Sequence, residues 1–348
     1  MQIYSNYSLF GHNPFGIDAK CWQYVDVETA KEAAQKLPFV ARSTRGHMVI
    51  GAGSNLLLTK DYDGIIIHSS IKGVTFSFAD DGGNDVYVRA GSGECFDDVV
   101  AATIGLGYYG LENLSIIPGD VGASAVQNIG AYGVEAKDYI HSIEAVEITT
   151  GKVLRISKAE CEYGYRQSRF KTDWKGRYLI THVTYKLSRE FVPHLQYGGI
   201  VKALENAGFA RLEGGDFEGL SAMDVRNVVM EIRNSKLPDP KELGNGGSFF
   251  MNPVVERRVF EALQEKYPLM PHYDVDARHV KIPTAWMIEQ CGWKGRALGK
   301  AAVHDKQALV LVNLGGATGR EILDLCNAVR QDVRERFCID IHPEVNIV

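Results

Sequence analysis

The sequence predicts an α+β protein of two or three domains, and three observations support this class. Its 348 residues exceed the size of one ordinary domain. Strand patterns are frequent between about residues 76 and 190, whereas helical patterns dominate after about residue 191. The composition, 45% hydrophobic and 23% charged, is typical of a globular chain. Strands and helices are therefore segregated along the chain, as in α+β folds.

The first region, up to about residue 75, combines one helix with two short strands. Thr29–Leu37 has the apolar spacing of a helix, and His47–Ile50 and Gly64–His68 have β-branched strand character. The strand at His47–Ile50 runs directly into Gly51-Ala-Gly-Ser-Asn55. Main-chain N–H groups in such a turn can bind an anion, although a plain tight turn explains the segment equally well.

The second region is rich in strands. A helix is expected after the first strand, Val86–Arg89. It would have Asp97 and Asp98 in its first turn and end near Ile104. A Thr-Thr-Gly turn joins two later strands into a hairpin. The expected strands are Val86–Arg89, Ile143–Ile148, Lys152–Ile156 and Tyr178–Leu187.

Residues 115–133 form a glycine-punctuated segment without strong periodicity, and we expect a loop there. Loops of this length inside a compact domain are usually functional. Four glycines with Ser124, Gln127 and Asn128 supply many uncharged donors, which suits a polar heterocycle together with a phosphate. A purely structural Ω-loop is the alternative.

The third region is mainly helical. Ser221 is a candidate N-cap, and Pro238 and Pro240 are expected to end the helix that it begins. Thr318 and Glu321 form a capping-box pattern at the start of another helix. The first helix should bury Met223, Val225, Val228, Val229 and Ile232, and the last should bury Ile322, Leu323, Leu325, Val329 and Val333. Further helices are expected at Val254–Lys266 and Thr284–Cys291, and a final strand within Ile339–Ile347.

Charge and hydropathy exclude several function classes. The net charge of −5 argues against a general nucleic-acid binder, which needs a basic excess. The apolar runs are too short to span a bilayer, and the first residues show no signal-peptide pattern. The six scattered cysteines include no Cys-x-x-Cys pair, so we expect free thiols in a reducing cytoplasm.

Several familiar motifs are incomplete or misplaced. Gly105-Leu-Gly-Tyr-Tyr-Gly110 fits a dinucleotide fingerprint but follows a helix, so a helix end and a turn explain it better. The chain has no phosphate-binding P-loop pattern and no zinc-ligand spacing, so no metal site is expected.

Six motifs, in order, carry a family resemblance. They are Asn13-Pro-Phe-Gly-Ile-Asp18, residues 117–133, Tyr163-Gly-Tyr-Arg-Gln-Ser168, Lys236-Leu-Pro-Asp-Pro240, Gly244-Asn-Gly-Gly-Ser-Phe-Phe-Met-Asn-Pro253 and His342-Pro-Glu-Val345. From about residue 10 to the C-terminus the chain resembles the UDP-N-acetylenolpyruvoylglucosamine reductases, and Tyr197-Gly198 and Tyr273 resemble the longer of the two family types.

The resemblance implies a fold and a reaction. The fold is a vanillyl-alcohol-oxidase (PCMH)-type FAD-binding module, residues 1–190, with subdomains of about 1–75 and 76–190. An α+β substrate-binding domain, residues 191–348, follows, and its last strand returns to the active site. The implied reaction reduces UDP-N-acetylglucosamine enolpyruvate to UDP-N-acetylmuramate with NADPH through non-covalent FAD, for peptidoglycan synthesis.

Site residues are implied by the same resemblance. Arg166 and Glu344 would lie at the substrate carboxylate, and Ser248 would give the proton to C2. Substrate-binding positions are Tyr197, Arg233, Lys236, Asn252, Tyr273 and Gln290. FAD-lining positions are Gly51, Gly53, Ser54, Asn55, Leu56, Pro118, Gly119, Gly122, Ala123, Ser124, Gln127, Asn128, Ile129, Gly130, Tyr132 and Gly133.

The diphosphate of such a substrate requires local positive charge in a net negative chain. Basic residues near the expected substrate elements are Arg166, Arg169, Lys171, Arg226, Arg233, Lys236 and Lys241, although a solvated basic face explains each of them equally well.

The sequence also departs from the family pattern, and other functions remain open. Asp120 stands where the family more often has an uncharged residue, so its carboxylate should point away from a pyrophosphate. Met251 stands where the family often has lysine, and Ala125 where it often has proline. The alternatives are another FAD-dependent oxidoreductase of this fold or an inactive nucleotide-sugar binder. We expect a cytoplasmic monomer that binds neither nucleic acid nor membrane.

Overall fold

The computed structural model describes residues 1–79 and 82–348, and the chain divides into two compact units. Unit 1 comprises Met1–Tyr7, Cys21–Ala52 and Asp63–Asn234, and unit 2 comprises Ser8–Lys20, Gly53–Tyr62 and Ser235–Val348. This division differs from the expected boundary near residue 190. Residues 191–234 pack in unit 1, and two short N-terminal segments pack in unit 2.

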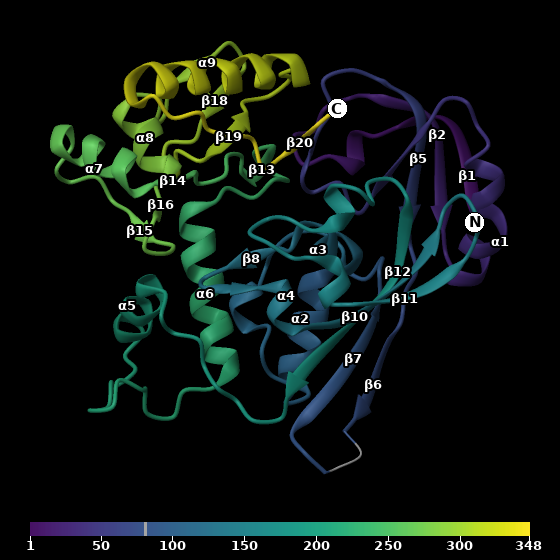
Figure 1. The fold of residues 1–348 in the computed structure, drawn as a ribbon, viewed down its shortest axis with the longest axis horizontal. Coiled ribbons are helices and arrows are strands. Elements are labelled where there is room, and N and C mark those ends of the chain that lie inside the picture. The colour runs from purple at the N-terminus through teal and green to yellow at the C-terminus, as the bar shows by residue number, and fades with distance from the viewer. Residues whose placement is uncertain (80–81) are drawn as a thin grey trace. The chain divides into compact units, whose positions relative to one another are not determined.

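Unit 1 contains two larger sheets and the helices that cover them (Figure 1). One sheet has the strand order β1-β2-β5-β3, and the other is antiparallel with the order β11-β10-β12-β7-β6. The elements that lie mainly in unit 1 are β1 (Gln2–Ser8), β2 (Lys20–Val27), α1 (Ala30–Val40), β3 (His47–Ile50), β5 (Tyr62–Ser69), β6 (Val74–Phe78), β7 (Asp85–Gly91), α2 (Phe96–Gly105), α3 (Val121–Gln127), β8 (Gly130–Ala131), β9 (Val134–Glu135), α4 (Ala136–Tyr139), β10 (Ile140–Glu147), β11 (Val153–Ser157), β12 (Tyr178–Ser188), α5 (Gly198–Asn206) and α6 (Ala222–Lys236).

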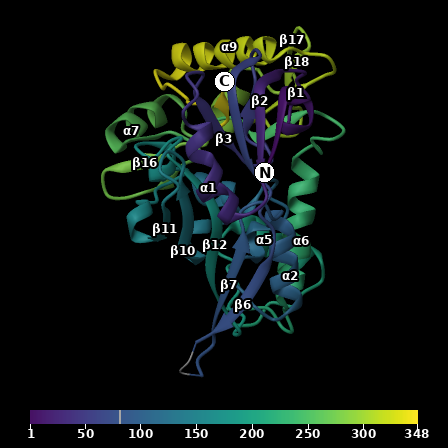
Figure 2. The ribbon, with the colours of Figure 1, turned by 90° about the vertical axis from the view of Figure 1, so that its right-hand side faces the viewer.

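Apolar side chains from the covering helices form the cores of unit 1. Helix α1 follows the N-cap Thr29 and buries Ala33 and Leu37 in a core shared with β2 and β5. Figure 2 shows the ribbon of α1 next to the strands of the first sheet. Helix α2 buries Phe96 and Val100 in a core shared with β7 and β12. These contacts follow the apolar spacing read from the sequence.

Unit 2 is a smaller α+β unit. Its main sheet has the order β13-β19-β18-β17, and helix α9 packs on β18 and β19 (Figure 1). The elements of unit 2 are β4 (Leu56–Leu57), β13 (Asn245–Ser248), β14 (Val254–Glu256), α7 (Arg257–Lys266), β15 (Tyr273–Asp274), β16 (His279–Lys281), α8 (Thr284–Gln290), β17 (Ala297–Leu298), β18 (Ala301–Val303), β19 (Val310–Asn313), α9 (Gly319–Phe337) and β20 (Asn346–Ile347).

Outside residues 115–133, three local expectations were wrong. Residues 254–256 form strand β14 because they pair with β16, so the helix expected from Val254 begins at Arg257. Met223 is 42% exposed, although Val225, Val228 and Val229 on the same helix are buried. The C-terminal strand is limited to the two residues of β20, because residues 342–344 make only isolated contacts with 249–251.

Candidate active site

The segment 115–133 of unit 1 is not the loop expected from the sequence. It contains helix α3 and strand β8, and β8 pairs with β9. Helix α3 ends at Asn128, whose backbone is left-handed. Gly122 lies so close to Ser92, the residue after β7, that an added Cβ would be 2.9 Å from the Cβ of Ser92. A side chain at this position would push the segment away from the sheet.

Two polar side chains of the segment are used inside unit 1. The buried Ser124 hydroxyl donates to the Val121 carbonyl at 2.7 Å and lies 3.0 Å from the Tyr185 hydroxyl. The Asn128 side-chain amide donates to the Gly164 carbonyl at 2.8 Å, and its oxygen accepts from the Lys137 N–H at 3.0 Å. These bonds fix the segment, and contact with a cofactor stays a prediction for both residues.

Arg166 is attached to the same segment. Its guanidinium donates to the carbonyls of Asn128, at 3.2 Å, and Gly130. Gly130 permits this approach, since an added Cβ would lie 2.8 Å from Arg166 Nη1. Lys171 donates to the Arg166 carbonyl at 2.8 Å and to Gln127 Oε1 at 2.7 Å. Lys171 is therefore a positioning residue for both predicted site residues, a role that only the fold reveals.

Tyr132, Tyr197 and Arg233 are brought together in unit 1. The two tyrosine rings make an edge contact with centroids 5.4 Å apart. Arg233 Nε is buried and has no hydrogen-bond partner within residues 1–79 and 82–348. Burial lowers the pKa of Arg233, while Tyr132 and Asp97 act in the opposite direction. A buried donor without a partner is costly, so this group is suited to an acceptor on a ligand.

Two of the basic candidates are neutralised by the protein itself. Arg226 makes a two-pronged contact with the Asp97 carboxylate, at 2.6 and 2.9 Å. Asp97 also accepts from the Ile116 N–H at 2.6 Å. Arg169 is paired with Asp173 at 2.5 Å. Arg226 therefore fixes the start of the 115–133 segment, and Arg169 belongs to an exposed ion pair.

Ser248 and Glu344 lie on neighbouring segments of unit 2. The Glu344 N–H donates to the Phe249 carbonyl at 2.7 Å, and the Met251 N–H donates to the His342 carbonyl at 2.9 Å. Ser248 ends strand β13 and is exposed. This pairing brings together two predicted catalytic residues that are almost a hundred positions apart in the chain.

The Asn13–Asp18 motif supports the strand that carries Ser248. The Asn245 N–H donates to the Pro14 carbonyl at 2.8 Å. An added Cβ at Gly244 would lie 2.6 Å from the Phe15 carbonyl oxygen, and one at Gly246 would lie 3.2 Å from the Phe15 ring. The glycines of residues 244–247 are therefore needed for close packing on Phe15, and the motif has a structural role that the sequence did not reveal.

The predicted cofactor residues 53–56 also lie in unit 2, next to the C-terminal segment. Gly53 has a φ of 80°, and an added Cβ would lie 1.9 Å from the His12 carbonyl oxygen. The Asn55 side-chain amide donates to the Glu344 carbonyl at 3.2 Å. Strand β4, which begins at Leu56, is parallel to β20. Asn55 and Glu344 are therefore neighbours, as a shared site requires.

The remaining substrate candidates are dispersed over unit 2. Asn252 accepts from the Thr284 N–H at 2.9 Å and so fixes the start of α8, whose last residue is Gln290. Tyr273 is 53% exposed on β15, with the Lys281 ammonium 5.7 Å from its ring centroid. Lys236 is the exposed last residue of α6. The substrate roles of these residues stay predictions.

Across residues 1–79 and 82–348, no group of three His, Cys, Asp or Glu side chains is arranged to hold a metal ion. In the same part of the chain, every helix falls short of the length and apolar character needed to cross a membrane. The six cysteines are free thiols.

The chain is similar to known proteins over its whole length. Residues 239–348 match the C-terminal domain of UDP-N-acetylenolpyruvoylglucosamine reductase, and residues 23–157 match an FAD binding domain. A UDP-N-acetylenolpyruvoylglucosamine reductase of Bacteroides fragilis is 50% identical over 98% of this chain and 99% of its own length. The protein of that name from Flavobacterium johnsoniae is 44% identical over 100% of both chains.

A solved structure supports the fold independently. The crystal structure of UDP-N-acetylenolpyruvylglucosamine reductase from Thermus caldophilus aligns with a TM-score of 0.65 at 19% identity, over 99% of this chain and 98% of that one. The predicted α+β class with an FAD-binding module is confirmed.

Proposed function

The chain belongs to the UDP-N-acetylenolpyruvoylglucosamine reductase family, and from this premise we propose that it reduces UDP-N-acetylglucosamine enolpyruvate to UDP-N-acetylmuramate with NADPH. It is an FAD-containing oxidoreductase. The observation that carries the proposal is the pairing of residues 249–251 with 342–344, which makes Ser248 and Glu344 neighbours. The product would serve peptidoglycan synthesis in the cytoplasm, and we expect a monomer.

The residues present fit an FAD molecule. Gly51 lets the two predicted cofactor segments approach each other, because an added Cβ there would lie 3.0 Å from Ala123 Cβ. Gly122 likewise lets the second segment pack closely, because an added Cβ there would lie 2.9 Å from Ser92 Cβ. Residues 51–56 and 117–133 would hold the cofactor. When bound, FAD supplies the group that accepts hydride from NADPH and delivers it to C3 of the enolpyruvyl double bond.

Protein groups would complete the reduction at C2. Hydride addition at C3 leaves an electron pair that spreads from C2 into the substrate carboxylate. The Arg166 guanidinium would hold that carboxylate with its planar fork. The Ser248 hydroxyl would donate a proton to C2, so that one hydride and one proton saturate the double bond. Glu344, beside Ser248 in unit 2, would act near the same carboxylate.

The diphosphate requires donors that the protein has not already used. Arg233 supplies a buried Nε without a partner among the described residues, and it lies with Tyr132 and Tyr197. We assign Arg233 and Tyr197 to the nucleotide part of the substrate. Lys236, Asn252, Tyr273 and Gln290 stay as further candidates.

The function is tested by following the two half-reactions separately. Purified protein should show a flavin absorbance spectrum that NADPH bleaches without oxygen, and the enolpyruvyl nucleotide sugar should restore the oxidised spectrum. UDP-N-acetylglucosamine, which lacks the enolpyruvyl group, should not restore it. Flavin released by acid would agree with non-covalent binding. If oxygen but not the enolpyruvyl substrate reoxidises the flavin rapidly, the chain is a different FAD oxidoreductase.

A further inference from the structure

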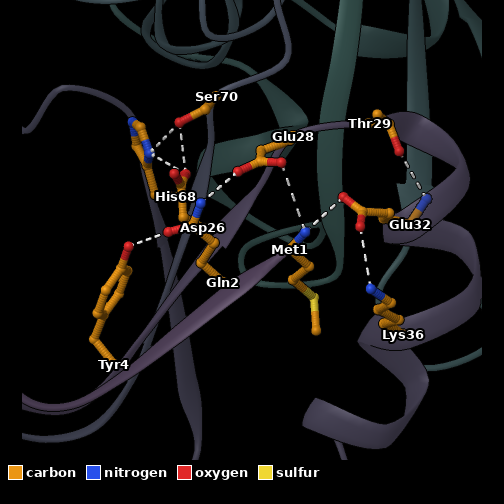
Figure 3. Close-up of polar contacts among 10 residues, drawn as sticks. All are labelled: Met1, Gln2, Tyr4, Asp26, Glu28, Thr29, Glu32, Lys36, His68 and Ser70. Atoms are coloured by element: carbon orange, nitrogen blue, oxygen red, sulfur yellow. Dashed lines mark hydrogen bonds and ion pairs between the residues drawn. The ribbon is translucent and has the colours of Figure 1, made fainter.

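A histidine of unit 1 is held between hydrogen-bonding groups of two strands. His68 lies on β5, and its Nδ1 is 2.9 Å from a carboxylate oxygen of Asp26 on β2 (Figure 3). Ser70, the residue after β5, donates to that oxygen at 2.6 Å and lies 3.3 Å from His68 Nδ1. Asp26 and Ser70 therefore fix the orientation of the imidazole ring.

The other side of the ring faces the predicted flavin-binding segment. His68 Nε2 lies 3.7 Å from Asp120 Oδ2, and the side chains are only 15% and 14% exposed. Asp120 directly precedes helix α3. His68 is paired with Ile50, the last residue of β3, and an added Cβ at Gly51 would lie 3.2 Å from Asp120 Oδ2. Asp120, His68 and the Gly51 turn thus form one cluster.

The charges in this cluster favour a protonated imidazole. Burial lowers the pKa of His68, but Asp120 and Asp26 together outweigh it and hold the pKa above its ordinary value. The Tyr24 ring stacks on the His68 ring, with the two ring centroids 5.8 Å apart. Burial raises the pKa of Tyr24, with smaller contributions from Asp26, Tyr7, Asp120 and Cys21, so this group stays neutral. Protonated His68 therefore offsets one of two carboxylate charges.

A carboxylate beside a phosphate site is repulsive unless a cation offsets it. We propose that His68 is the internal counter-ion of Asp120 and thereby sets the affinity of the flavin-binding segment for the phosphates of FAD. The proposal rests on the function proposed above, because it assigns residues 51–56 and 117–133 to FAD.

The proposal has a defined pH dependence. The favourable contact of His68 with both carboxylates is complete at pH values below the ordinary histidine pKa, about 6.5. It is lost as the pH rises through the higher pKa of His68 in the folded protein. The negative charge of Asp120 beside the predicted flavin-binding segment is then no longer offset, so the affinity for FAD should fall in alkaline solution.

The test measures the dissociation constant of FAD from the apoprotein by flavin fluorescence, at pH 6 and pH 9 and constant ionic strength. Four proteins are compared: the unaltered chain, His68→Gln, Asp120→Asn and the double variant. We expect FAD to bind the unaltered chain about tenfold more weakly at pH 9, a factor within the usual range of coupling between sites. His68→Gln should bind weakly at both pH values, whereas Asp120→Asn and the double variant should bind tightly at both.

Riboflavin, which lacks phosphates, is the matched probe, and its affinity should not follow the titration of His68. The proposal is overturned if Asp120→Asn keeps the full pH dependence. It is also overturned if the double variant binds as weakly as His68→Gln, since the histidine would then be merely structural. Asp120→Asn is informative even if His68→Gln does not fold. An unaltered chain that binds no FAD at either pH overturns the flavin assignment itself, and this proposal with it.

Discussion

Arg166 combines a strained backbone with fixed side-chain contacts. Its φ of 54° lies in the left-handed region, which is uncommon for arginine. The guanidinium donates to the Asn128 and Gly130 carbonyls, and these contacts hold the strained residue in a defined position beside the 115–133 segment. Strain of this kind commonly marks functional residues, and here it agrees with the proposed carboxylate contact.

Changing Arg166 to Lys should not preserve activity. An ammonium group lacks the planar fork that holds a carboxylate and also loses one of the two carbonyl contacts. We expect turnover to fall at least about a hundredfold, as when one transition-state donor is removed. Steady-state kinetics and FAD content are measured together. Arg169→Lys, in the exposed pair with Asp173, is the control and should stay near normal; near-normal turnover of Arg166→Lys would contradict the role.

Changing Ser248 to Ala should separate the two half-reactions. The hydroxyl is exposed at the end of β13 and is proposed to act only when the substrate is protonated. Flavin reduction by NADPH should be unchanged, whereas reoxidation by substrate should slow about a hundredfold or more. Stopped-flow absorbance measures both rates. Ser77→Ala, another exposed strand serine, should alter neither rate; equal slowing of both rates in Ser248→Ala would exclude the assignment.

At the scale of an element, helix α3 shows how a small residue positions a whole segment. The Gly122 N–H donates to the Ser92 carbonyl at 2.9 Å, so the helix start contacts the sheet through its main chain. Val121 and Ala125, which belong to this helix, are buried. The helix can therefore move little without breaking either the hydrogen bond or the core contact.

Changing Gly122 to Ala should displace α3 and weaken FAD binding. The new Cβ would lie 2.9 Å from the Cβ of Ser92, so either the helix or strand β7 must shift. We expect the FAD dissociation constant to rise about tenfold, with a loss of about 1–3 kcal/mol in unfolding free energy from overpacking. Fluorescence titration and urea denaturation measure the two effects. Gly105→Ala, where a Cβ has open space within helix α2, is the control and should bind FAD normally.

At the scale of the whole molecule, each unit is fixed by contacts between distant parts of the chain. In unit 1, the Asp97 carboxylate on α2 accepts hydrogen bonds from Arg226 on α6 and from the Ile116 N–H. Burial raises the pKa of Asp97, but Arg226 and the Ile116 N–H outweigh it and hold the pKa below its ordinary value. In unit 2, Asn313 donates to the Phe15 carbonyl at 2.8 Å. Such contacts unite segments that lie far apart in the sequence.

Changing Asp97 to Asn should destabilise unit 1 by about 3 kcal/mol at pH 7, since it leaves Arg226 with no carboxylate partner in a mostly buried position. Because the pKa of Asp97 is lowered, its contribution is complete above the unfolded value of about 3.9 and is lost as the pH falls through the folded value. Urea denaturation at pH 7, 5 and 3.5 measures this.

Asp97→Leu combined with Arg226→Met is the matched control, and it should cost less than Asp97→Asn because no buried charge is left unpaired. The difference between the unaltered chain and Asp97→Asn should shrink only at the lowest pH. A difference that stays constant down to pH 3.5 would show that the ion pair does not contribute as described.

Local elements could be predicted where neighbouring residues determine them. Thr29 caps α1, and Thr318 and Glu321 form a complete capping box on α9. The hairpin of β10 and β11 follows its turn residues. In each case the stabilising contacts lie within a few positions of one another, so the sequence pattern is sufficient.

The family motifs were recognised from the sequence, but their structural contacts were not. Residues 117–133 and 244–253 were identified correctly as a family pattern, and the family assignment is confirmed. The sequence did not show that the 117–133 segment contains α3. It also did not show that Lys171 donates a hydrogen bond to Gln127, or that Arg226 forms an ion pair with Asp97. These roles depend on partners distant in the chain.

The sequence by itself determined the fold class, the caps and turns, the flavin and the family. The tertiary structure decided which polar residues are already used by the protein and which are left for a ligand. Arg226 and Arg233 lie two helical turns apart on α6, yet the first is neutralised by Asp97 and the second keeps a buried Nε without a partner among the described residues. Local pattern cannot distinguish them, because the free energy of a buried charge depends on groups that only folding brings into contact.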